Sequence, residues 1–248
     1  MPELHQIALK IVSNGKGILA ADESTGSMTK RLDSVNVISN PENRLNFRET
    51  LFSSNGMENF IGGVILFDET IRQTTKSGKS IPELIIQSGA VVGIKLDTGA
   101  KVLAGSPEEK VTEGLDGLRE RLAEYYELGA RFTKWRAVYN ISEKYPSELA
   151  IKSNAHALAR YAALVQEANM VPIVEPEILM DGSHTIEDSF VVTEEVLHSV
   201  FYELYGQNVL LEGMILKPNM VLSGYKCSEQ ASIDEVAEMT GTAEYAGN

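Results

Sequence analysis

The sequence predicts an α/β fold built on a parallel sheet, and two observations support this. Short apolar runs rich in Val and Ile recur between long helical patterns, and they lack a polar face over most of their length. Such runs are typical of strands buried on both sides of a parallel sheet. Strands that alternate with helices form right-handed βαβ units, and 248 residues are enough to bury one large core.

Six segments are expected to be strands, namely residues 17–22, 62–67, 90–97, 130–139, 170–178 and 212–220. The first starts at residue 17 and the sixth at residue 212, an average of about 39 residues per unit. A closed (β/α)₈ barrel needs eight strands, and two more units at this spacing would need about 80 further residues. The spacing therefore leaves two alternatives, a six-stranded open sheet or a barrel that lacks its last quarter.

Four helices are expected between these strands, over residues 41–53, 114–128, 147–168 and 191–205. The first opens with Asn40 as its N-cap and Pro41 at the first helical position. The second ends at Gly129, the third begins at Ser147, and the fourth follows Asp188. No linker of domain length separates these elements, so we expect one domain.

The composition indicates a globular protein with an acidic surface. Apolar residues make up 43% and charged residues 23%, which excludes a disordered or fibrous chain. A net charge of -13 repels a phosphate backbone, so we expect no nucleic-acid partner. We also expect no membrane span, because no apolar stretch reaches roughly 18 residues, and no signal peptide. With the lone Cys227, these features predict a cytoplasmic protein.

Ionisable residues gather toward the C-terminal ends of the predicted strands: Asp22, then Lys95 and Asp97, Lys134 and Arg136, Glu175 and Glu177, and Lys217. Because side chains alternate along a strand, each pair two residues apart shares a face. A buried charge costs several kcal/mol unless it is paired, so any one pair could be a structural salt bridge. Five strands with charges at one end favour an active site, since α/β folds place their sites there.

Histidine and glycine patterns narrow the chemistry. The four histidines form no ligand-spaced pair with another His or Cys, so a zinc site is not expected. His156 and His198 lie within helical patterns and are interpreted as ordinary helix residues. Gly62, Gly63 and Gly93 are interpreted as positions of close packing rather than as a phosphate loop.

Lysine and carboxylate chemistry is what remains. A lysine that is partly desolvated and surrounded by cations has a lowered pKa and attacks carbonyl groups. Lys217 and Lys134 are both candidates for this nucleophile, and Glu175 or Glu177 could move the protons that imine formation requires. The residues therefore favour an enzyme that forms a Schiff base.

Eight segments, in chain order, resemble class I fructose-1,6-bisphosphate aldolases: GILAADESTGS, GGVILFDET, VVGIKLD, AGSPEEKVTEGLDGL, FTKWRAVY, ALARYAALVQE, VPIVEPEIL and LEGMILKPNM. The resemblance runs from about residue 15 to residue 240. It implies a (β/α)₈ barrel of the TIM type, usually a homotetramer, that needs no metal or other cofactor. It also implies the reversible cleavage of fructose 1,6-bisphosphate into dihydroxyacetone phosphate and glyceraldehyde 3-phosphate, a step of glycolysis and gluconeogenesis.

The resemblance also implies a role for individual residues. Lys217 matches the lysine that forms the imine with the substrate C2 carbonyl, and Glu175 matches the acid/base that assists dehydration. Asp22 matches the acid that handles the C4 hydroxyl proton, Lys134 holds charge near the imine, and Glu177 tunes the nucleophile. The positions that match substrate contacts, several of them at phosphates, are Ser24, Ser27, Lys30, Arg31, Lys95 and Arg136.

One departure from the family concerns the C-terminal part of the sequence. The family has a seventh strand with a Ser-Gly-Gly phosphate loop and an eighth ending in a Gly-Arg phosphate contact, and neither pattern occurs here. We therefore expect residues 1–248 to form a single aldolase-type barrel domain with about six of eight β/α units, lacking those after about residue 240. If the barrel is completed, a homo-oligomer is expected. Two functions stay open: an active aldolase, or an impaired aldolase-like chain that acts only through binding or oligomerisation.

Overall fold

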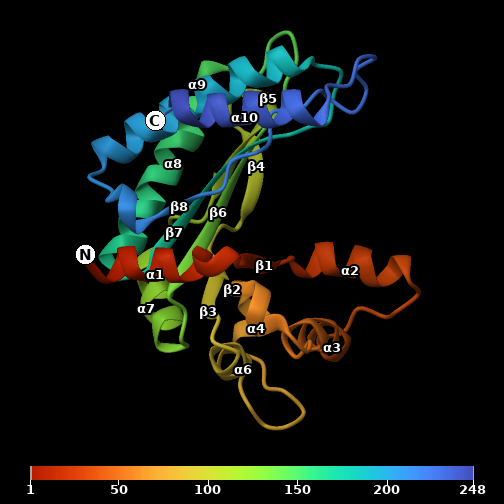
Figure 1. The fold of residues 1–248 in the computed structure, drawn as a ribbon, viewed down its shortest axis with the longest axis vertical. Coiled ribbons are helices and arrows are strands. Elements are labelled where there is room, and N and C mark those ends of the chain that lie inside the picture. Colours follow the sequence, from red (N-terminus) through yellow and green to blue (C-terminus); the bar gives the residue numbers. More distant parts are fainter. Residues whose placement is uncertain (1, 248) are drawn as a thin grey trace.

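Six parallel strands form one curled sheet in the computed structural model, which describes residues 2–247 (Figure 1). In spatial order these strands are β1 (Gly17–Ala21), β2 (Ile61–Leu66), β3 (Val91–Lys95), β6 (Phe132–Tyr139), β7 (Val171–Ile178) and β8 (Ile215–Leu216). Every neighbouring pair in this sheet is parallel. The predicted α/β fold is confirmed, and five of the six predicted segments are strands over most of their length. The segment predicted over residues 212–220 is a strand only at Ile215–Leu216, after a 3₁₀ helix at Leu211–Gly213.

The sheet is curled strongly enough to bring distant strands together on its inner face. In a flat sheet, β1 and β6 would lie about 14 Å apart, since three strand spacings separate them. The Lys134 Nζ atom on β6 nevertheless lies 3.1 Å from Asp22 Oδ2, just after β1. The six strands therefore follow the wall of a TIM-type barrel, and the charged face is the inner one.

Helices pack on the outer face of the sheet, with α8 and α9 against β6 and β7, and α4, α5 and α6 against β2 and β3. Helix α10 packs on α9, and α2 extends away from the end of β1 (Figure 1). The helices are α1 (Pro2–Val12), α2 (Thr25–Ser34), α3 (Pro41–Phe52), α4 (Met57–Phe60), α5 (Asp68–Ile71), α6 (Ile81–Gln87), α7 (Leu118–Glu127), α8 (Glu148–Glu167), α9 (Ile186–Gly206) and α10 (Ile233–Gly247). The main core lies between sheet and helices. At its centre Trp135 of β6 packs on Tyr161 of α8, with ring centroids 5.3 Å apart.

Capping residues explain where the predicted helices begin. The Asn40 side chain accepts a hydrogen bond from the Asn43 amide, and Pro41 opens α3, as expected. Ser147 caps α8. The expected start of α9 at residue 191 is wrong by five residues, because Thr185 and Asp188 form a capping box that starts the helix at Ile186. Helix α7 starts at Leu118 rather than at residue 114, since residues 114–117 form a turn.

A β-hairpin between β3 and α7 was not expected from the sequence. Its strands, β4 (Gly99–Leu103) and β5 (Ser106–Glu113), pair with each other and not with the main sheet. The buried Glu109 carboxylate accepts hydrogen bonds from the Ser147 amide at 2.7 Å and from Ser106 Oγ at 2.8 Å. Asn154 of α8 accepts from the Thr112 amide and donates to the Lys110 carbonyl. These polar side chains fix the hairpin to α8.

Helix α1 packs against the N-terminal ends of the strands, where glycine is required. Ile11 of α1 belongs to a small core with Phe132 and residues of β7. A Cβ atom at Gly62 would lie 2.0 Å from the Ile11 carbonyl oxygen, and one at Gly93 would lie 2.3 Å from the Phe132 ring. The interpretation of these glycines as close-packing positions is confirmed.

Candidate active site

A cavity of about 930 Å³ opens at the C-terminal ends of the strands. Its walls come from the main sheet, from the loop that leads into α2, and from the β4–β5 hairpin. Ten of the eleven predicted site residues line this cavity. The exception is Lys30, which is exposed on α2 and is not among the residues that line the cavity.

Four of these residues form one continuous chain of ion pairs. The Lys134 ammonium lies 3.1 Å from Asp22 Oδ2 and 3.1 Å from Glu175 Oε2. The other oxygen of Glu175, Oε1, accepts a hydrogen bond from Lys217. Lys134, Asp22 and Glu175 are buried, whereas the Lys217 side chain is 49% exposed. These ion pairs therefore connect the C-terminal ends of β1, β6, β7 and β8 on the inner face of the sheet.

The charge of Lys134 distinguishes the two candidate nucleophiles. A nucleophilic lysine needs a lowered pKa, but the pKa of Lys134 is raised, which fits the charge-holding role that the family resemblance implies. Burial opposes its positive charge, and the carboxylates of Asp22 and Glu175 more than offset that effect. Lys134 is therefore a fixed cation at neutral pH, and of the two candidate nucleophiles only Lys217 keeps an amine that is both accessible and in contact with a buried carboxylate.

Two further ion pairs lie next to this chain: the first joins two residues that the periodicity placed on one face of a strand, and the second joins two strands, which the periodicity did not predict. Lys95 contacts the Asp97 carboxylate and donates to the Asp97 carbonyl at 3.1 Å. Arg136 pairs with Glu177 across β6 and β7. Burial opposes the charge of Arg136, yet its hydrogen bond to Glu177 leaves the pKa of Arg136 raised. Both cations line the cavity and can exchange their carboxylate partners for a substrate anion.

The loop after β1 carries the remaining predicted residues. Ser24 caps α2, accepting a hydrogen bond from the Ser27 amide at 3.3 Å, and the two hydroxyl oxygens lie 3.2 Å apart. Arg31 pairs with Glu23 at 2.8 Å, and its side chain is otherwise exposed. The Ser24 and Ser27 hydroxyls thus face the cavity from the first turn of α2, where the helix dipole favours anions, and the Arg31 guanidinium lines it from the last turn.

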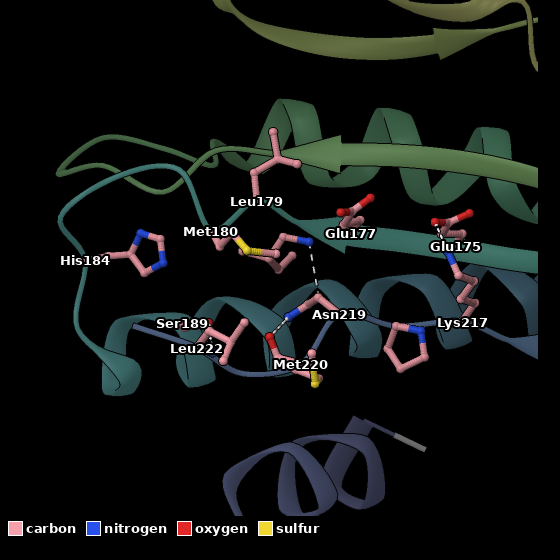
Figure 2. A pocket seen from close by; sticks show the side chains of 12 residues that line it. Glu175, Glu177, Leu179, Met180, His184, Ser189, Lys217, Asn219, Met220 and Leu222 are labelled. Carbon is pink, nitrogen blue, oxygen red and sulfur yellow. Dashed lines mark hydrogen bonds and ion pairs between the residues drawn. The ribbon is translucent and has the colours of Figure 1, made fainter. Parts of the chain in front are cut away.

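A smaller cavity of about 190 Å³ lies on the other side of Lys217 (Figure 2). Figure 2 shows the Lys217 side chain directed toward Glu175, with Glu177 beside it. The Lys217 amide donates to the Val174 carbonyl at 2.9 Å, and Asn219 accepts from the Ile178 amide at 3.2 Å. These contacts carry the pairing of β7 beyond the two residues of β8 and hold Lys217 in place.

The sequence did not indicate several polar residues around the site. Asp68, Lys110 and Arg121 also line the large cavity, and Arg121 donates to the carbonyls of Leu96 and Gly114. Arg48 of α3 is fully buried behind β1. Of these residues only Arg48 could have been recognised from the sequence, because its spacing of four from Arg44 and from Phe52 places all three on one helix face.

Residues 2–247 contain no group of three or more His, Cys, Asp or Glu side chains arranged to hold a metal ion. Within the same residues, no helix is long and apolar enough to cross a membrane.

The fold and site define an α/β protein of the TIM-barrel type with a lysine and carboxylate centre, and comparison with known proteins identifies its family. The family model described as glycolytic, fructose-bisphosphate aldolase class-I, matches residues 3–244. A probable class 1 fructose-bisphosphate aldolase of Xylella fastidiosa is 56% identical over 238 residues, which are 96% of this chain and 71% of that protein. Fructose-bisphosphate aldolase B of Rattus norvegicus is 51% identical, over 97% of this chain and 66% of its own length.

A solved structure shows the same fold. It contains the fructose-bisphosphate aldolase of Plasmodium falciparum, crystallised with TRAP and a small-molecule inhibitor. The TM-score is 0.97 at 46% identity, over 99% of this chain and 72% of that one. The chain belongs to the class I fructose-bisphosphate aldolase family. The prediction made from its motifs is thereby confirmed, and with it phosphorylated sugars as the family's class of substrate.

Proposed function

We propose that this chain cleaves fructose 1,6-bisphosphate reversibly through an imine on Lys217. The observation that carries the proposal is the continuous chain from Asp22 through Lys134 and Glu175 to Lys217. It joins a nucleophile, a proton carrier, a fixed cation and a second carboxylate in one cavity. Aldol cleavage by a Schiff base needs these four functions together.

The first half of the reaction forms the imine. The uncharged Lys217 amine attacks the C2 carbonyl, and the new C–N bond gives a carbinolamine. Glu175 is in contact with Lys217, so it can take the lysine proton and later return a proton to the departing hydroxyl, which leaves as water. Lys134 stays charged between Glu175 and Asp22 and holds both carboxylates in place. Glu177 beside this centre tunes the lysine.

The second half breaks the carbon–carbon bond. The protonated imine accepts the electron pair of the C3–C4 bond while Asp22 takes the proton of the C4 hydroxyl, which releases the aldehyde product. The remaining enamine gains a proton at C3, and water hydrolyses the imine to release dihydroxyacetone phosphate. A buried carboxylate in contact with a fixed cation is suited to this role, because the contact holds its oxygens in one place beside the reacting carbons.

Substrate recognition is proposed for the polar residues around this centre. Arg31, Lys95 and Arg136 line the cavity and offer donors to phosphate and hydroxyl groups, with Ser24 and Ser27 contributing hydroxyls. The role of Lys30 rests on the resemblance of its motif alone. A local cluster of cations is what allows a chain with a net charge of -13 to bind a bisphosphate.

Reductive trapping tests the nucleophile. Borohydride treatment with dihydroxyacetone phosphate is expected to give one adduct per chain, mapped by peptide mass spectrometry to Lys217. Lys217→Met should abolish the adduct, and Glu175→Gln should slow its formation without preventing it. Lys226→Met, which removes an exposed lysine, is the matched control and should trap at the parental rate. An adduct on another lysine, or an undiminished adduct in Lys217→Met, contradicts the proposal.

Steady-state cleavage separates an active enzyme from a chain that only binds. Turnover of fructose 1,6-bisphosphate above the Lys217→Met background supports the active aldolase. Trapping without turnover favours the alternative, an impaired aldolase-like chain that acts through binding or oligomerisation.

We also propose a cytoplasmic homo-oligomer in which residues 1–248 act as one barrel-type domain, as expected from the sequence. The family resemblance and the single cysteine support this. Light scattering coupled to gel filtration measures the oligomeric state, and a monomer at every concentration contradicts it.

A further inference from the structure

Helix α3 carries two buried arginines one turn apart, and they have different partners. Arg44 makes a two-pronged ion pair with Glu69, at 2.8 and 2.5 Å. Arg48 is 0% exposed and donates mainly to backbone: Nε to the Ala21 carbonyl at 3.0 Å and Nη2 to the Glu23 carbonyl at 2.6 Å. These two carbonyls belong to the residues on either side of Asp22.

Packing alone does not account for an arginine at position 48. Its closest carboxylate oxygen, Glu23 Oε2, lies 3.9 Å away, and Nη1 is buried without a hydrogen-bond partner in residues 2–247. Burial lowers the pKa of Arg48, and the nearby charges of Glu23 and Glu69 oppose this effect. A buried cation with incomplete partners costs free energy that an apolar side chain of similar size would not.

The geometry points to Arg48 as a positioning residue: we propose that it fixes the main chain on both sides of Asp22 and so directs the Asp22 carboxylate at Lys134. The guanidinium is planar and rigid, so its two donors hold the two carbonyls at a set separation. Asp22 itself lies 3.1 Å from Lys134 and makes no hydrogen bond to Arg48 among those present. Arg48 therefore sets the position of the carboxylate through the backbone, while its charge also attracts that of Asp22 at longer range.

This inference rests on the role proposed for Asp22, and it predicts a selective defect. Asp22 is needed when the C3–C4 bond breaks, whereas imine formation with dihydroxyacetone phosphate uses Lys217 and Glu175. A loosened Asp22 should therefore slow cleavage and leave trapping intact. A general loss of structure would reduce both.

The variant is Arg48→Lys, which keeps the charge but cannot hold two carbonyls with one plane. Arg44→Lys is the matched control, on the same helix and similarly buried but directed to Glu69. In Arg48→Lys, kcat for cleavage should fall by about 10²-fold, the cost of a displacement near 1 Å, while adduct formation at Lys217 is unchanged. Arg44→Lys should leave both unchanged. Equal losses of cleavage and trapping in Arg48→Lys would overturn the proposal.

A double-mutant cycle tests whether Arg48 acts through Asp22. In an Asp22→Asn background, Arg48→Lys should cause little further loss of kcat, since the carboxylate it positions is already gone. Multiplicative losses would show an independent role and overturn the proposal. If Arg48→Lys does not fold, Arg48→Gln, which buries no charge, replaces it in the same cycle; multiplicative losses of kcat in Asp22→Asn and Arg48→Gln would again overturn the proposal.

Thermal melting extends the cycle to conditions without turnover. Asp22→Asn is introduced into the parent and into Arg48→Lys. The decrease in melting temperature should be larger in the parent, because only there does Arg48 hold Asp22 against Lys134. Equal decreases overturn the positioning role. Absence of any adduct in the parent would instead contradict the proposed function, and the melting comparison would still decide the role of Arg48.

Discussion

Burial and charge act in opposite directions on Lys134. Burial alone would favour the neutral amine, which is the state that a nucleophilic Lys134 would need. The two carboxylates that reverse this, Asp22 and Glu175, come from strands far apart in the sequence. The strand pattern shows which residues share a face of one strand, but not which side chain of another strand lies opposite. For this reason the strand pattern predicted the members of the site but left Lys134 and Lys217 as alternative nucleophiles, and only the family resemblance implied a charged Lys134.

Removal of the Lys134 charge tests this account. Lys134→Met leaves the buried carboxylates of Asp22 and Glu175 without their shared cation, so we expect the free energy of unfolding to fall by about 3–5 kcal/mol. Urea denaturation followed by circular dichroism measures the change. Lys152→Met is the control, because it removes an exposed ion pair with Glu148 and should leave the free energy of unfolding nearly unchanged. Similar losses in both variants would contradict a buried network.

Among the elements, the apolar pattern predicted the strands and the capping residues predicted helix starts, whereas elements held by buried polar side chains were not predicted. Five strands, the position of the short sixth strand and the first helix residues at Pro41 and Glu148 followed from the sequence. The β4–β5 hairpin did not, because SPEEKVTE has no alternating apolar face and its buried contacts are made by Glu109 and by Asn154 of α8. The helices α1, α2, α4, α5, α6 and α10 were likewise not expected.

The packing of α1 on β2 gives a prediction at this scale. Gly62→Ala would place a methyl group 2.0 Å from the Ile11 carbonyl oxygen, so α1 must move away. We expect a loss of about 1–3 kcal/mol in the free energy of unfolding, as for other overpacked sites. Gly241→Ala in α10 meets no atom within 4 Å and should gain up to about 1 kcal/mol. The two variants are compared in one denaturation series, and equal effects would refute the close approach.

For the molecule as a whole, charge is distributed unevenly. The net charge is -13, yet the large cavity is lined by both signs in nearly equal number. The excess negative charge therefore lies elsewhere on the protein, where it repels itself across water. Such repulsion destabilises the compact state and is screened by salt, whereas the buried chain from Asp22 to Lys217 is screened much less.

Salt should therefore stabilise this protein at neutral pH. Between about 0.01 and 0.15 M salt the screening length falls from about 30 to 8 Å, so we expect the melting temperature to rise. Calorimetry over a chloride series measures this. Near pH 4.8, the isoelectric point of the sequence, the net charge is close to zero and the rise should disappear. A melting temperature that falls with salt at neutral pH would show that surface ion pairs outweigh the repulsion.

The ion pair between Lys134 and Asp22 also has a consequence for folding kinetics. It joins residues that are 112 positions apart in the sequence, and the contact of Lys217 with Glu175 joins residues that are 42 positions apart. Closing such long loops costs chain entropy before any contact repays it, so local structure such as the hairpin and helices forms first. A nascent chain thus acquires its secondary structure well before it acquires its chemistry, and the nucleophile stays unassembled until β8 has docked on β7.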